Sequence, residues 1–261
     1  MNILAFFAHP DDETMLAGGT LALLAELGSK VHFLSATRGE GGETGNPSLV
    51  SQADLGPFRE QELVCAVRAL GGASLTFLGY LDPLVGPDDT LYPYTQDLTL
   101  LAGQVALSIR QFEVDAVITH GSNGEYGHPA HVLTHQATRI AVESLGEAAP
   151  LLYTTQAIYP DHPRPRLANQ DDPADLVIDI TRSLARKEAA ALCHRTQHDL
   201  FTRKTAEEVG HPVTVAETIR LVPVESLHRA WPACQPGQKA DSLEELLRNA
   251  GVLIQAGGER R

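Results

Sequence analysis

Residues 2–27 read NILAFFAHPDDETMLAGGTLALLAEL and decide the fold. The apolar run over residues 2–8 is typical of a buried strand. The stretch 13–27 repeats leucine on related faces and stops at Gly28, which predicts a helix. A buried strand that leads directly into a helix is the first half of a βαβ unit, the repeating element of α/β proteins.

The same alternation continues along the first half of the chain. Further strands are predicted at 31–36, 75–78, 114–119 and 151–159, and further helices at 59–70, 98–112 and 129–145. The pattern predicts a doubly wound α/β fold, with a mostly parallel, Rossmann-like sheet and helices on both faces. The loops 37–58 and 79–97 have a length typical of functional loops.

The pattern becomes looser after residues 160–175, a Pro- and Asp-rich stretch that indicates a surface linker. Beyond it the sequence predicts a strand at 176–180, a helix at 182–194, a strand pair at 213–222 and a short helix at 242–249. We therefore expect an α/β catalytic core with a metal site over 1–160. Residues 161–261 then form a C-terminal extension that completes or covers the site, and not an independent domain.

The composition excludes several classes of partner. With 20 Lys+Arg against 33 Asp+Glu, the 261-residue chain has a formal net charge of -13, which argues against nucleic acid and anionic membranes. No apolar run reaches the roughly 18 residues of a spanning helix, and no basic segment precedes the first apolar run as in a signal peptide. Cys65, Cys193 and Cys234 are far apart, which argues against a disulfide framework and predicts a cytoplasmic protein. The composition is compatible with a monomer and with a homo-oligomer.

A cluster of chemically active residues, His9-Pro10-Asp11-Asp12-Glu13, directly follows the first strand. Ligands of open α/β sheets bind at the carboxyl ends of the strands. The simpler interpretation is that one aspartate caps the helix and that the helix dipole favours Glu13. That interpretation explains one acid but not a His-Pro pair before two acids, so we expect a functional site here.

A second cluster, residues 123–131 (NGEYGHPAH), follows the strand at 114–119. His128 and His131 flank the start of the next helix, at the sheet edge where the first cluster lies. For His135 alone a packing role is the better interpretation, and for His120 packing and function are equally supported. The topology thus predicts that both clusters meet in one crevice.

The combined residues suit metal-assisted hydrolysis. Two histidines and one carboxylate, with one open position, form a common catalytic zinc site, in which the pKa of the bound water falls to about 7. A second carboxylate can accept a proton as the water attacks, and a neighbouring histidine can protonate the leaving group or support the oxyanion. Asp11 and His128 have the right chemistry for these two roles.

Several segments together resemble the LmbE-like (PIG-L-type) family of metal-dependent N-deacetylases, which act on molecules containing N-acetylglucosamine. These segments are AHPDDE (8–13), TRGEGGE (37–43), FREQEL (58–63), LTFLG (75–79), NGEYGHPAHVLTH (123–135) and RKEAAALCHRTQ (186–197). The resemblance covers most of residues 1–200. It is closest, around 123–135, to deacetylases of mycothiol-type or bacillithiol-type thiol biosynthesis.

The resemblance assigns roles to individual residues. It implies that His9, Asp12 and His131 bind zinc, with ferrous iron as the alternative metal. Asp11 corresponds to the general base of the family and His128 to its catalytic histidine.

Other correspondences concern the substrate. Tyr126 corresponds to a mobile tyrosine that polarises the acetyl carbonyl in some members. Arg59, Glu43 and Asn123 correspond to substrate-binding positions. For Arg59 an exposed helix-start charge, and for Glu43 a loop charge, is a serious competing interpretation. The family commonly has Asp where this chain has Ala130. Because outer carboxylates tune catalytic histidines, we expect a less basic His128 or support from another acid.

We therefore expect a zinc hydrolase that removes the N-acetyl group from a small N-acetylglucosaminyl conjugate. An amidase acting on a glucosaminyl thiol conjugate is the alternative within the family. A non-haem iron oxygenase uses a similar ligand set but leaves Asp11 without a task. A non-catalytic binding protein on the same fold would not be expected to retain all five residues.

Overall fold

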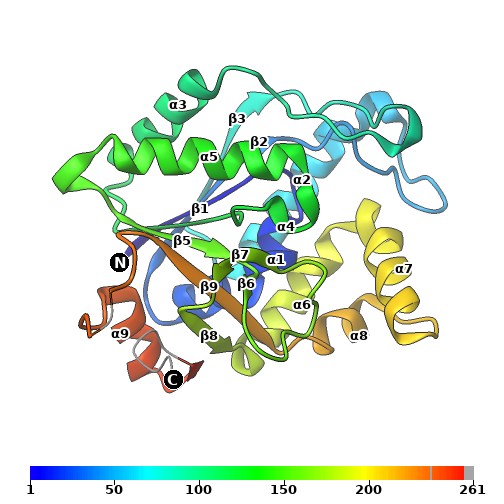
Figure 1. Ribbon diagram of the computed structural model, residues 1–261. Helices are drawn as coiled ribbons and strands as arrows, with labels where there is room; N and C mark the ends of the chain where they lie inside the picture. The colour runs from blue at the N-terminus through cyan, green and yellow to red at the C-terminus, as the bar shows by residue number, and fades with distance from the viewer. Residues whose placement is uncertain (236, 256–261) are drawn as a thin grey trace.

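The computed structural model describes residues 1–235 and 237–255, and one eight-stranded sheet runs through its centre (Figure 1). Its strands are β1 (Asn2–Phe7), β2 (Lys30–Thr37), β3 (Ser74–Tyr80), β4 (Ala116–Thr119), β5 (Leu151–Thr155), β8 (Leu176–Asp179), β9 (Val224–Trp231) and β10 (Leu253–Gln255). The strand order is β10-β8-β9-β5-β4-β1-β2-β3. The five strands from β5 to β3 pair in parallel, whereas β9 is antiparallel to both β5 and β8.

Helices cover both faces of the sheet, as the sequence predicts (Figure 1). They are α1 (Asp12–Glu26), α2 (Leu55–Leu70), α3 (Leu98–Gln111), α4 (Gly124–Gly127), α5 (Pro129–Glu143), α6 (Leu184–Cys193), α7 (His198–Val209), α8 (Val215–Arg220) and α9 (Ser242–Asn249). One face packs against α1, α2, α6 and α9, and the other against α3 and α5. The doubly wound α/β fold is confirmed.

The first strand shows why its sequence is apolar without interruption. Ile3, Ala5 and Phe7 pack under α1 and α2, while Leu4 and Phe6 pack under α3 and α5. A parallel strand covered on both faces needs apolar side chains at every position. Because β1 lies between β2 and β4, its carboxyl end opens at the middle of the sheet edge.

The C-terminal half differs from the prediction in several places. The strand pair expected at 213–222 is wrong: the segment contains helix α8, which begins with a capping box between Thr214 and Glu217. Helix α7 and strand β9 were not predicted. The expected linker 160–175 contains β7 (Asn169–Pro173), which pairs with β6 (Ala157–Ile158) in a small second sheet. The single strand expected at 151–159 is broken at Gln156, whose φ is 53°.

The stretch 161–261 contributes to the same sheet as the first half, through β8, β9 and β10. Residues 236 and 256–261 of this stretch lie outside the described residues. Within the described part of the chain, every helix is too short or too polar to cross a bilayer.

Candidate active site

A pocket of about 140 Å³ opens at the carboxyl ends of the central parallel strands. The parallel pairing of β1 with β4, which places Phe6 opposite Thr119, brings the two predicted clusters together there. The polar side chains that line the pocket are His9, Asp11, Asp12, Arg59, Asp82, Tyr92, Tyr126, His128, His131 and Gln197. Seven of the nine residues predicted for the site are therefore at one pocket.

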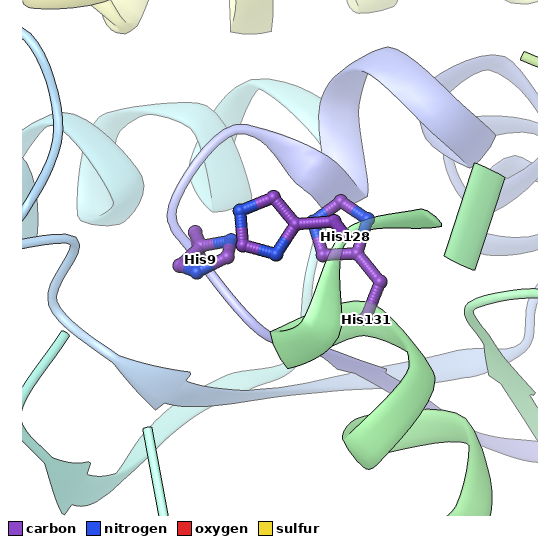
Figure 2. Close-up of side chains that lie close together, drawn as sticks. All are labelled: His9, His128 and His131. Carbon is purple, nitrogen blue, oxygen red and sulfur yellow. The ribbon is translucent and has the colours of Figure 1, made fainter. Parts of the chain in front are cut away.

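The three predicted metal ligands converge. His9 Nδ1 lies 3.2 Å from Asp12 Oδ2, and His131 Nε2 lies 3.3 Å from Asp12 Oδ1. All three residues are buried. Figure 2 shows His9, from the loop after β1, facing His128 and His131 at the start of α5. One ligand atom from each of these three histidines lies within 4.8 Å of the others, so His128 could approach the same cation.

The carboxylates around the three predicted metal ligands favour a positive charge at this site. Burial lowers the pKa of His9, but Asp82 and Asp12 outweigh that effect and raise the pKa to about 10. Burial likewise raises the pKa of Asp12, yet His131 and His120 hold it well below its usual range. Two imidazoles and a carboxylate with matching geometry are the donors that a divalent transition metal requires, so the residues fit a metal site.

Glu125 orients His131, and the sequence analysis missed it. Its Oε2 accepts hydrogen bonds from His131 Nδ1 at 2.7 Å and from His120 Nδ1 at 3.1 Å. His131 Nε2 is thereby left unprotonated toward Asp12, as in carboxylate–histidine–metal arrangements. His120 Nε2 accepts the backbone N–H of Ala8, which assigns His120 to a supporting role. The signal in the sequence was a single acid between His120 and His128.

Asp11 lies beside the predicted metal ligands and forms an ion pair with Arg59. Arg59 Nη2 contacts its Oδ2 at 3.2 Å, and Arg59 also donates to the carbonyl of Gly39. Arg59 is 3% exposed, so the alternative of an exposed helix-start charge is wrong. Burial raises the pKa of Asp11 to about 7, against the lowering effect of Arg59 and with a further rise from Asp12. A base with such a pKa suits proton transfer at neutral pH.

His128 caps the N-terminus of α5. Its Nδ1 accepts the backbone N–H of Ala130 at 3.2 Å, so the proton of the neutral ring is on Nε2. Burial, and then the neighbouring His131 and His9, lower the pKa of His128 to about 3. Tyr126, which is 58% exposed, has its ring 5.7 Å from those of His128 and His131.

Two further pocket residues, Asp82 and Gln197, were not predicted: Asp82 lies outside the family-like segments, and Gln197 ends the segment 186–197, to which no role was assigned. Asp82, in the loop after β3, contacts His9 Nε2 at 3.2 Å and accepts the N–H of Gly41. Gln197, just before α7, lines the pocket and donates to the carbonyl of Glu43. Both depend on tertiary contacts that sequence spacing does not reveal.

Two residues predicted to bind substrate lie outside the residues that line the pocket. The Glu43 carboxylate pairs with Arg203 at 2.7 Å on the surface. Asn123 donates to Asp171 at 2.7 Å. Both side chains have structural partners, so the structure gives no support to their predicted role. His135, expected to pack, is buried and lies 3.1 Å from the carbonyl oxygen of His120.

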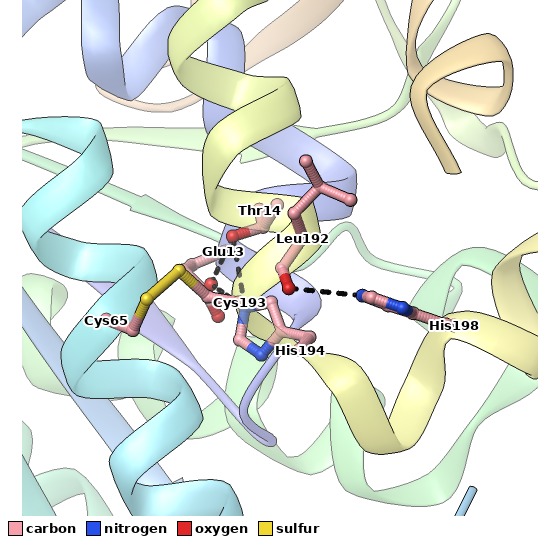
Figure 3. The surroundings of a disulfide bond; sticks show 7 residues. All are labelled: Glu13, Thr14, Cys65, Leu192, Cys193, His194 and His198. Carbon is pink, nitrogen blue, oxygen red and sulfur yellow. Dashed lines mark hydrogen bonds and ion pairs between the residues drawn. A yellow bond between two sulfur atoms is a disulfide. The ribbon is translucent and has the colours of Figure 1, made fainter. Parts of the chain in front are cut away.

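Behind Asp11, a buried cluster connects the site to a disulfide (Figure 3). Glu13 accepts the Asp11 N–H at 2.9 Å, and His194 Nε2 lies 2.9 Å from the same carboxylate. Cys193, directly before His194 in the chain, is bonded to Cys65, and the two Cα atoms are 5.6 Å apart.

The spacing of the cysteines argued against a disulfide, and for Cys65 and Cys193 that expectation is wrong. Cys65 is an exposed residue of α2, and α2 packs against α6, which ends at Cys193. The fold brings the two residues together across 128 positions of sequence. Spacing along the chain could not reveal this contact.

Comparison with known proteins adds independent findings. The sequence profile of the PIG-L family, described as GlcNAc-PI de-N-acetylase, matches residues 4–142. A 1D-myo-inositol 2-acetamido-2-deoxy-alpha-D-glucopyranoside deacetylase from Mycobacterium sp. (strain KMS) is 34% identical over an alignment of 228 residues, and the match covers 75% of this chain and 73% of that protein.

Two solved structures share the fold. N,N'-diacetylchitobiose deacetylase from Pyrococcus horikoshii matches with a TM-score of 0.60 and 21% identity, over 87% of this chain and 82% of that one. GalB, the 4-carboxy-2-hydroxymuconate hydratase from Pseudomonas putida KT2440, matches with a TM-score of 0.61 and 22% identity, over 91% and 99%. One is a hydrolase and the other a hydratase, so at this level of identity the fold does not determine the reaction.

Proposed function

The chain belongs to the PIG-L family of de-N-acetylases, and from that premise we propose that it is a zinc-dependent hydrolase. Its proposed reaction removes the N-acetyl group from a small N-acetylglucosaminyl conjugate. The observation that carries the proposal is the convergence of His9, Asp12 and His131 beside a second carboxylate, Asp11. The deacetylase activity of the mycobacterial relative supports it.

His9, Asp12 and His131 would hold the metal, with ferrous iron as the alternative to zinc. When bound, the cation supplies Lewis acidity toward the acetyl carbonyl and lowers the pKa of a water molecule to about 7 in zinc enzymes. Glu125 fixes the orientation of the His131 ring through its Nδ1. Asp82 contacts Nε2 of His9 in the same way, which leaves His9 Nδ1 on the side of Asp12.

Asp11 acts as the general base in this proposal. Its carboxylate projects into the pocket beside the metal ligand Asp12, and the Arg59 contact holds its Oδ2 in place. It takes the proton of the attacking water and then delivers it toward the departing amine. Burial keeps competing bulk water away from the carboxylate while the proton is transferred.

His128 supports the carbonyl oxygen as negative charge develops there. Because its Nδ1 accepts the Ala130 N–H, its Nε2–H is free to donate into the pocket. Tyr126, exposed at the pocket mouth, can add its hydroxyl to the same oxygen.

The proposal also covers the organisation of the chain. Residues 1–160 carry the metal ligands and Asp11, and the extension 161–261 completes the pocket through Gln197 and Leu200.

The composition supports a cytoplasmic enzyme, whereas the Cys65–Cys193 bond is typical of oxidising compartments. Cell fractionation decides between the two locations.

The decisive experiment supplies the zinc-loaded and the ferrous protein with a set of N-acetylglucosaminyl conjugates and measures free amine and acetate. An amide-linked glucosaminyl thiol conjugate in the same set tests the amidase alternative. We expect Asp11→Asn to lose at least about a hundredfold in kcat, the scale of a general base, while its metal content is unchanged. Asp97→Asn, at the N-terminus of α3 and away from the pocket, is the matched control. Activity that survives Asp11→Asn, or no free amine from any conjugate with either metal, would overturn the proposal.

A further inference from the structure

The pocket has two chemically different parts. Its floor consists of the carboxylates and histidines described above. Its outer wall is mostly apolar and consists of Pro83, Val85, Leu91, Leu200 and Tyr92, whose hydroxyl is the one polar side-chain group among them; we call this wall the apolar collar. Resting on the proposed deacetylase function, we infer that the natural substrate carries an apolar aglycone, an aryl or alkyl group, on its N-acetylglucosamine.

The size of the pocket separates the two ends of the substrate. A volume of about 140 Å³ is below the roughly 300–1,000 Å³ of pockets that enclose most of a small ligand. The acetamido group must reach the floor, because Asp11 and the proposed ligands lie there. The enclosed space therefore holds the sugar end, and the aglycone extends over the collar.

The collar exposes apolar surface at the place where the aglycone would lie. Val85 is 49% exposed and Tyr92 44% exposed, and Leu81 and Leu84 on the same loop are 67% and 62% exposed. Leu200, from α7, faces the pocket from a different part of the chain. Clustered apolar side chains that stay in contact with water beside a polar pocket mark a binding surface.

Two polar side chains of the pocket wall, Arg59 and Gln197, are already hydrogen-bonded within the protein. Among the described residues that line the pocket, Arg59 is the one Lys or Arg side chain, and it is held by Asp11 and by the carbonyls of Gly39 and Pro10. Gln197 uses its Nε2 on the carbonyl of Glu43.

A polyol aglycone would lose water at the collar and gain few hydrogen bonds in return, which is unfavourable. An aryl or alkyl group loses no hydrogen bonds there and buries apolar area. The inference therefore separates this chain from its mycobacterial relative, whose named substrate carries inositol.

The test compares three substrates on the zinc-loaded protein: phenyl 2-acetamido-2-deoxyglucopyranoside in both anomers, the inositol conjugate, and free N-acetylglucosamine. We expect kcat/KM for the better phenyl anomer to exceed that for the inositol conjugate at least about tenfold, mostly through a lower KM. Free N-acetylglucosamine, which lacks an aglycone, should be hydrolysed with a similar kcat.

Collar variants link that preference to the proposed surface. Val85→Thr and Tyr92→Ala together should reduce kcat/KM for the phenyl substrate about tenfold and leave free N-acetylglucosamine within about twofold. Both side chains are exposed, so the variants should fold. Val209→Thr is the matched control, because Val209 is also exposed but lies at the end of α7, outside the pocket.

The outcomes separate the two proposals. An inositol conjugate hydrolysed as well as the phenyl substrate, or a phenyl preference that survives the collar variants, overturns the apolar aglycone and leaves the deacetylase function standing. No free amine from any of the three substrates refutes the proposed function itself, and the inference with it.

Discussion

His128 and His131 lie three residues apart at the start of α5, with their rings stacked at a centroid distance of 4.4 Å, yet their partners differ. His131 Nδ1 faces the carboxylate of Glu125, whereas His128 Nδ1 accepts a backbone N–H. The first arrangement leaves an unprotonated Nε2, which suits a metal ligand. The second leaves the proton on Nε2, which suits a hydrogen-bond donor. The partner of Nδ1 thus assigns the two neighbouring histidines to different tasks.

Ala130, at the position where the family commonly has aspartate, offers His128 no carboxylate partner. The methyl group of Ala130 is fully buried in the apolar cluster between the sheet and the helices α3 and α5. An aspartate at this position would place a carboxylate in that cluster, which is costly unless His128 pairs with it. Glu125 supports His131 and His120 and leaves His128 unsupported. Burial first, and then His131 and His9, lower the pKa of His128 to about 3, and a ring less basic than in relatives stays a prediction.

The largest expected effect on kcat comes from removing His128, the proposed hydrogen-bond donor to the carbonyl oxygen. We expect His128→Ala to lower kcat about 10²–10³-fold, the typical cost of one oxyanion donor, with unchanged zinc content. His128→Gln should recover part of the activity, because its amide N–H can also donate. Steady-state kinetics together with metal analysis checks both. Loss of zinc in parallel with activity would place His128 among the ligands and contradict the division of tasks.

The next effect concerns the support of His131. Glu125→Gln removes the carboxylate but keeps the size of the side chain, and we expect zinc affinity to fall about 10–100-fold. Activity at saturating zinc should recover toward the parent value. Glu143→Gln, at the exposed end of α5, the helix that carries His131, is the matched control. Zinc affinity that is unchanged in Glu125→Gln would show that His131 needs no carboxylate partner.

The smallest expected effect comes from giving His128 a carboxylate neighbour, as His131 has in Glu125. Ala130→Asp places an anion beside His128, which favours the protonated ring and raises its pKa, by about 1–3 units for a close pair. We expect the limb of the pH–rate profile that reports His128 to move to higher pH, with kcat at pH 7 changed less than about tenfold. Ala130→Asn, similar in shape but neutral, should leave the profile in place. Identical profiles for both variants would exclude tuning by this position.

The parallel core and most of the site could be predicted because they depend on local pattern. A run of apolar residues buried on both faces identifies β1, and parallel strands bring their carboxyl ends to one edge. His9 and His131 follow two such strands. Glu125 and Asp82 could not be assigned in the same way, because their roles arise from contacts that only the folded chain makes.

Strand β9 shows why the C-terminal half was harder to predict. Its sequence VESLHRAW places charged residues inside the sheet. Glu225 is buried because Lys187 of α6 pairs with it at 2.7 Å, and Arg229 because Asp241 does so at 2.8 Å. These partners lie far away in sequence, so the alternation of apolar and polar residues that marks a strand is obscured.

The bond between Cys65 and Cys193 also changes the covalent connectivity of the chain. It closes a ring that contains every residue from 65 to 193 and leaves two open tails, one with His9 and Asp12 and one with Gln197 and Leu200. A single proteolytic cut inside the ring, for example in the exposed loop after β3, would leave the protein as one covalent unit until the bond is reduced. A cut in either tail would separate a fragment in denaturing electrophoresis even without reductant. Electrophoresis of the nicked protein with and without reductant would therefore show which segment a protease reached.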